Sequence, residues 1–200
     1  GHLLGGLTTL GLLVWLLLET RRSGKALQPA RRHIPWLAVS GLVILGMQIA
    51  LGGWTSSNYA ALACPDIPTC QGQWWPEDSN FAEGFVLWRG LGINYEFGVL
   101  DAPSRVAIHF AHRLGAVATF TMLLLIGLRF RARSQAAALR WAATLVLGAV
   151  TLQVLIGAGV VWFGLPLTLA TAHNAVAALL LLTMINLNHA ASFTANRHPA

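Results

Sequence analysis

The chain has 200 residues, of which 56% are hydrophobic and only 10% are charged, and its formal net charge is +6. This composition is too apolar for an ordinary soluble domain. The apolar residues fall in runs of about 20, the length that crosses roughly 30 Å of hydrocarbon at about 1.5 Å per residue. The sequence therefore predicts an all-α integral membrane protein.

Five membrane-spanning helices are expected from these apolar runs. They cover residues 2–18, 34–54, 105–128, 141–163 and 167–188. A long loop, residues 55–104, separates the second span from the third, and a tight turn at residues 164–166 separates the last two. We expect the last four helices to form a four-helix bundle.

The charged residues predict the orientation of the spans. Six of the seven acidic residues lie in the loop 55–104, and ten of the thirteen basic residues lie on the opposite side of the spans. The ten basic residues are Arg21, Arg22, Lys25, Arg31, Arg32, Arg129, Arg131, Arg133, Arg140 and Arg197. Because lysine and arginine accumulate on the cytoplasmic side, the connection 21–33 and the tail 191–200 are predicted to be cytoplasmic. The positive charge reflects topology, so no nucleic-acid partner is expected.

Two of the spans carry a histidine at matching depth. His112 lies nine residues after Pro103 and His173 lies seven residues after Pro166, a difference of about 3 Å along the membrane normal. Ionisable side chains inside a span mark functional sites by default. Two imidazoles from separate helices suit both axial positions of a haem iron, an arrangement that favours electron transfer. We therefore predict a haem site, with hydrogen-bonded core histidines as the alternative.

His109 and Arg113 lie beside His112 on the same predicted helix. Because residues three apart are neighbours on a helix, spacing alone allows either His109 or His112 to bind iron, and the other could contact a propionate or line the cavity. Arg113 could pair with a haem propionate or extend to the outer lipid headgroups. A zinc site that also uses Cys64 and Cys70 is disfavoured, because five residues separate the cysteines rather than the roughly two to four usual in zinc sites.

Cys64 and Cys70 lie in the outer loop, where the compartment is oxidising. A structural disulfide between them is therefore expected, with a redox role in activity as the less favoured alternative. By restricting the unfolded chain it would stabilise the loop by about 2 kcal/mol.

A faint internal repeat relates two of the spans. Gln-Ile-Ala-Leu-Gly-Gly at residues 48–53 resembles Gln-Val-Leu-Ile-Gly-Ala-Gly at residues 153–159, and each is followed by a helix that carries a histidine. The glycines could simply allow close helix packing. The alternative is a duplicated hairpin in which each copy supplies one axial ligand and the small residues leave room for a macrocycle.

His2 lies at the outer end of the first span, in a setting, Gly-His-Leu-Leu-Gly, that resembles the surroundings of His173. By the same reasoning we expect it to bind a second haem, with its partner ligand upstream. The sequence opens inside an apolar run, so we expect it to be the later part of a longer protein.

Several stretches resemble the haem A synthase family, particularly the bacterial branch with paired loop cysteines. They are residues 51–70, residues 94–105, Ile-His-Phe-Ala-His-Arg at 108–113 and Ala-His-Asn at 172–174. The resemblance covers nearly the whole chain and implies the C-terminal part of a doubled, eight-helix bundle. The expected divisions are 1–20, the truncated last helix of the substrate-haem half; 21–33, a linker; 34–190, the haem b domain; and 191–200, the tail.

The resemblance implies an oxidoreductase that converts the C8 methyl of haem O to the formyl of haem A for cytochrome oxidase biogenesis. His112 and His173 would be axial ligands of an electron-relaying haem b, and His2 a ligand of the substrate haem iron. The catalytic residues are expected upstream, so the fragment alone is expected to be inactive. The implied location is the bacterial inner membrane, with loop 55–104 on the periplasmic side.

The implied partners are haem O, the lipid bilayer, haem O synthase, oxidase assembly factors and a second copy of the chain. Two alternative functions stay open from the sequence. One is a membrane cytochrome b that transfers electrons without catalysis, and the other is a transporter without haem.

Overall fold

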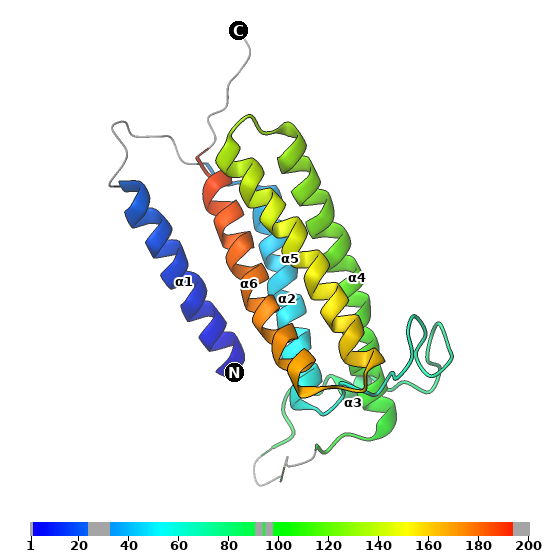
Figure 1. Cartoon of the computed structure of the whole chain (residues 1–200). Coiled ribbons are helices and arrows are strands. Elements are labelled where there is room, and N and C mark those ends of the chain that lie inside the picture. The colour runs from blue at the N-terminus through cyan, green and yellow to red at the C-terminus, as the bar shows by residue number, and fades with distance from the viewer. Residues whose placement is uncertain (1, 24–32, 91–93, 95–97, 194–200) are drawn as a thin grey trace.

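Apolar runs become helices in a membrane because every backbone N–H and C=O must be hydrogen-bonded within the segment once water is excluded. The computed structural model describes residues 2–23, 33–90, 94 and 98–193. Within these residues the helices are α1 (His2–Ser23), α2 (Trp36–Ser57), α3 (Phe81–Gly84), α4 (Ala102–Arg133), α5 (Ala137–Trp162) and α6 (Leu167–Ala191) (Figure 1). All except α3 are long and apolar enough to cross a membrane. The prediction of an all-α integral membrane protein with five spans is confirmed.

Part of the predicted topology falls outside the described residues. This is true of four of the ten basic residues on the predicted cytoplasmic side and of the tail from residue 194 onward. The four residues are Lys25, Arg31, Arg32 and Arg197.

The helix α4 is longer than the apolar run that predicted it. It begins at Ala102, where the Asp101 carboxylate accepts a hydrogen bond of 2.9 Å from the Ser104 N–H and Pro103 occupies the first turn. It ends at Arg133, so its 32 residues measure about 48 Å, against roughly 30 Å of hydrocarbon. The helix is therefore longer than the hydrocarbon core, and it extends beyond the predicted span 105–128 at both ends.

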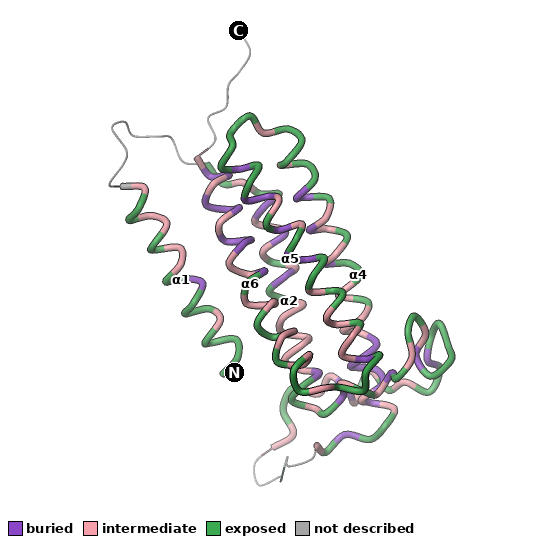
Figure 2. The backbone as a smooth tube through the Cα atoms, viewed as in Figure 1, coloured by how far each residue is buried: buried purple, intermediate pink, exposed green. Residues whose placement is uncertain are grey.

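The helices α2, α4, α5 and α6 form a four-helix bundle. α2 and α5 each contact both α4 and α6, which closes the ring (Figure 1). We call the end that carries residues 55–104 the loop end. The largest buried apolar cluster, which includes Leu45, Leu123, Val146 and Met184, fills the bundle away from the loop end (Figure 2). The half of the bundle nearer the loop end is thus left for other side chains.

The helix α1 lies beside this bundle and is not part of the ring. It contacts α6 and, less extensively, α2. Its apolar side chains are largely exposed, for example Leu12 at 66% and Leu13 at 59%. Near its C-terminal end, Glu19 lies 3.7 Å from His189 of α6, and the Trp15 ring packs against the same imidazole edge to face.

The loop between α2 and α4 folds against the start of α4. Cys64 and Cys70 form a disulfide, as predicted, and both are fully buried against Val106 and Phe110 of α4. The Trp75 ring packs edge to face on Phe110, with 5.2 Å between the ring centroids. The loop end of α4 is therefore covered by protein.

Candidate functional site

A glutamine of α2 contacts His112 of α4. Gln48 Nε2 lies 3.1 Å from His112 Nδ1 and 3.0 Å from the main-chain oxygen of His112. Gly52, one helical turn after Gln48, lies against the ring, and a Cβ there would be 3.3 Å from His112 Cε1. A Cβ at Gly115 would collide with Gln48 Oε1. Two glycines therefore leave the space that the imidazole and the amide occupy.

His173 of α6 has the same kind of neighbours on α5. Gln153 Nε2 lies 3.2 Å from His173 Nε2. Gly157, again one turn later, lies so close that a Cβ would be 2.8 Å from His173 Cε1. The repeat in the sequence thus corresponds to repeated contacts: a glutamine meets a ring nitrogen, and a glycine four residues later packs on the ring.

The two imidazoles share one region of the bundle and keep polar atoms without partners. Among the described residues, His173 Nδ1, Gln48 Oε1 and Gln153 Oε1 are buried and have no hydrogen-bond partner. His112 Nε2 also makes no hydrogen bond within the described part of the chain. Because such an unsatisfied group costs about 1–3 kcal/mol, these atoms indicate a binding site for a group that uses them.

These residues fit a haem iron better than a metal ion held by protein alone. Each ring keeps one nitrogen available, and a haem needs only two such donors because the porphyrin supplies the others. The described residues contain no cluster of three or more His, Cys, Asp or Glu that could hold a metal ion. Cys64 and Cys70 are joined to each other and so cannot act as thiolate ligands.

His109 and Arg113 bind the loop. The Cys64 N–H donates to His109 Nδ1 over 3.2 Å. Arg113 Nη1 donates to the main-chain oxygens of Asp66 and Thr69, each over 2.7 Å, and its Nη2 donates to the Cys64 oxygen over 2.6 Å. The sequence did not predict that one guanidinium holds three carbonyls of the disulfide loop. Contact of either side chain with a haem propionate stays a prediction.

Asp66 organises this loop from within. Its carboxylate accepts hydrogen bonds from the Thr69 hydroxyl and from the N–H groups of Gln71 and Gly72. These hydrogen bonds, above all that of Thr69, lower the pKa of Asp66 from 3.8 to about 2. The carboxylate is therefore ionised at neutral pH, and the loop presents its carbonyls to Arg113 in a fixed arrangement.

His2 is exposed at the start of α1. Its role as a ligand stays a prediction.

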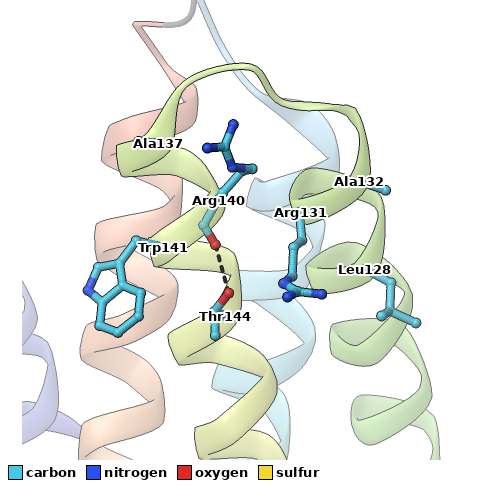
Figure 3. A pocket seen from close by; sticks show the side chains of 7 residues that line it. All are labelled: Leu128, Arg131, Ala132, Ala137, Arg140, Trp141 and Thr144. Atoms are coloured by element: carbon cyan, nitrogen blue, oxygen red, sulfur yellow. Dashed lines mark hydrogen bonds between the residues drawn. The ribbon is translucent and has the colours of Figure 1, made fainter.

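Two cavities of the structure lie elsewhere. The larger, about 760 Å³, lies at the end of the bundle remote from the loop end, where Arg131 of α4 and Arg140 and Trp141 of α5 line it (Figure 3). The smaller, about 320 Å³, is an apolar space between α1, α2 and α6. Neither His112 nor His173 lines one of these two cavities. The candidate site is therefore identified by its unpartnered polar atoms and not by a cavity.

Comparison with known proteins covers most of the chain. Residues 1–185 match the family model COX15-CtaA, a cytochrome oxidase assembly protein. The chain is 44% identical over 189 residues to the haem A synthase of Shewanella oneidensis, covering 94% of this chain and 56% of that protein. The haem A synthase of Rhizorhabdus wittichii is 28% identical over 190 residues, covering 94% and 50% of the two chains. That of Roseobacter denitrificans is 30% identical over 180 residues, covering 88% and 44%.

The chain spans about half the length of the curated relatives it matches. No solved structure matches it. The family expected from the loop cysteines and the histidine motifs is confirmed, and the chain belongs to the COX15-CtaA family of cytochrome oxidase assembly proteins.

Proposed function

We propose that this chain is the haem b-binding part of a haem A synthase. The whole protein would oxidise the C8 methyl of haem O to the formyl of haem A for cytochrome oxidase biogenesis. The family and the names of the relatives support this reaction class. The observation that carries the proposal is the pair of imidazoles on α4 and α6. Gln48 faces His112 Nδ1 and Gln153 faces His173 Nε2, and His173 Nδ1 is buried without a partner among the described residues.

In this proposal His112 and His173 would hold the iron of haem b. Bound haem b would supply a one-electron redox centre. The chain provides the neutral imidazole nitrogens, and Gly52 and Gly157 let both rings lie against helix backbones. With both histidines as ligands, no position at the iron would stay open, which would suit electron transfer and not oxygen binding. We therefore assign an electron relay to this bundle and place the oxidation of the methyl group in the remaining part of the protein.

Residues 34–190 would form this haem b unit, and α1 would belong to the substrate-haem unit, with His2 as an iron ligand. The position of α1 outside the ring and its exposed apolar face support this division. The loop 55–104 would face the periplasm of the bacterial inner membrane. Its disulfide fits an oxidising compartment, and the arginines at the other end of α4 fit the cytoplasmic side.

Pigment analysis tests the proposal. The purified chain should show a Soret band and a b-type haem, and His112→Ala and His173→Ala should each remove the low-spin spectrum. His33→Ala is the matched control, since this histidine is exposed outside the spans. In a host that also makes haem O synthase, the whole protein should yield haem A in acid extracts. A b-type haem without haem A would identify an electron carrier, and the absence of a Soret band would favour a transporter.

A further inference from the structure

The cavity of about 760 Å³ lies between the end of α4 and the start of α5, remote from the loop end (Figure 3). Leu128, Arg131 and Ala132 of α4 and Arg140 and Trp141 of α5 are among the residues that line it. Its volume falls within the roughly 300–1,000 Å³ of sites that bind small molecules. The proposed haem site does not use this cavity, so its charged lining needs a separate explanation.

Two guanidinium groups line this cavity without an acidic partner. Arg140 Nη1 donates to the main-chain oxygens of Ser134 and Gln135 over 3.4 and 3.0 Å, which holds this side chain at the α4–α5 connection. Arg131 makes no hydrogen bond or ion pair within the described part of the chain. None of the described residues that line the cavity is acidic. The lining therefore favours an anion.

The acidic residues of the chain lie elsewhere. Six of the seven belong to the loop 55–104, and the seventh, Glu19, lies 3.7 Å from His189 of α6. Glu19 does not line the cavity. The anion that the two arginines favour is therefore to be sought outside the chain.

The depth of the two arginines in the membrane indicates which anion. Arg131 lies three residues, about 4.5 Å, beyond Leu128, where the predicted span 105–128 ends. Arg140 directly precedes Trp141, where the next predicted span begins. Both guanidinium groups thus lie at the level of the lipid headgroups. The exposed ring of Trp141 is typical of this level, and Leu128 extends the lining toward the acyl chains.

We propose that this cavity binds the headgroup phosphate of an anionic phospholipid. The guanidinium groups of Arg131 and Arg140 pair with the phosphate oxygens, for which their planar arrangement of donors is suited. Leu128 and Trp141 contact the glycerol and the first methylene groups of the acyl chains. The lipid thereby links α4 to α5 at the end of the bundle that has no disulfide loop. This inference goes beyond the proposed function and does not depend on haem binding.

The test measures lipid binding by the full chain in a neutral detergent. Native mass spectrometry follows titrations with phosphatidylglycerol, with phosphatidylcholine, and with glycerol phosphate as the headgroup without acyl chains. Arg131→Gln removes one guanidinium, and Ala132→Phe fills the cavity while both charges stay. Arg129→Gln is the matched control, because it removes the same exposed charge from the same end of α4 and Arg129 does not line the cavity. Far-UV circular dichroism checks that each variant keeps its helices.

The unmodified chain should bind phosphatidylglycerol about 5-fold more tightly than phosphatidylcholine, and glycerol phosphate should not displace the lipid. Arg131→Gln should weaken phosphatidylglycerol binding about 10-fold, and Ala132→Phe should weaken it at least as much. Arg129→Gln should change it by less than about twofold, because a charge outside the cavity acts only through screened attraction.

Three results would overturn the inference. Equal losses in Arg129→Gln and Arg131→Gln would show diffuse attraction to the basic end of α4. Unchanged binding by a folded Ala132→Phe variant would show that the lipid lies outside the cavity. Displacement of the lipid by glycerol phosphate at equal concentration would identify a site for a soluble phosphate compound. Each of these results leaves the haem proposal untouched, since that proposal is tested by the pigment of the chain.

Discussion

Replacing Gly157 by alanine tests whether the ring of His173 rests on the backbone of α5. The added Cβ would lie 2.8 Å from His173 Cε1, whereas ordinary contact begins at 3.4 Å. The ring must therefore move by about 0.6 Å, more than the roughly 0.2 Å that metal–ligand distances tolerate. Overpacking of this kind costs about 1–3 kcal/mol. At about 1.4 kcal/mol per tenfold, haem affinity should fall roughly 5- to 150-fold.

Gly148→Ala is the matched control on the same helix, because a Cβ there would meet nothing within 4 Å. Both substitutions replace a glycine inside α5, so both gain about 1 kcal/mol of helix propensity and only one meets the ring. Titration of haemin into the apoprotein, followed at the Soret band, gives the two affinities. Equal affinities for Gly157→Ala and the unmodified chain would refute the contact as part of a ligand site. Equal losses in both variants would show a general packing effect.

Two further predictions concern the disulfide loop. Arg113→Gln removes the charged donor to three loop carbonyls, so a phosphine should reduce the disulfide faster at pH 7. Arg105→Gln, at the start of α4, is the control and should leave the reduction rate unchanged. Because the pKa of Asp66 is lowered to about 2, its contribution to loop stability is complete above the ordinary value of 3.8 and is lost as the pH falls through 2. The reduction rate, relative to an unstructured peptide disulfide, should be constant from about pH 8 to 5 and rise between about 4 and 2. Asp66→Asn should be fast throughout, and a flat profile for the unmodified chain down to pH 2 would contradict the role of Asp66.

The five spans could be predicted because hydrocarbon leaves an apolar run of about 20 residues little choice but a helix. The start of α4 could not be predicted from hydropathy, because its first turns are covered by the loop and not by lipid. The cap at Asp101 and the proline at 103 were the local signals for the true start. The helix α3 has only four residues and was not predicted.

The histidines could be found from their depth in the sequence, but their neighbours could not. Whether Gln48 meets His112 depends on how far each helix is rotated about its own axis, and that rotation is set by packing against neighbouring helices. The signal was present in the sequence, as an amide at the same place in both copies of the repeat. The contacts of Arg113 depend on the path of the loop. The predicted disulfide fixed only the distance between Cys64 and Cys70, and not the direction in which the loop carbonyls point.

The two copies of the repeat are anchored by different means. His112 is followed directly by Arg113, so the loop carbonyls that bind the guanidinium also fix the helical turn that carries this imidazole. The α5–α6 connection is instead a tight turn, in which the Leu165 N–H donates to the Val160 oxygen over 2.7 Å. A short hairpin fixes the register of its own helices, whereas α2 and α4 are joined through about 45 residues and need the disulfide, Asp66 and Arg113 to hold them. The glutamines and glycines make the contacts to the histidine rings, so these positions are alike in both copies. Each copy is anchored by different residues, and the sequence of the repeat can therefore differ at the other positions.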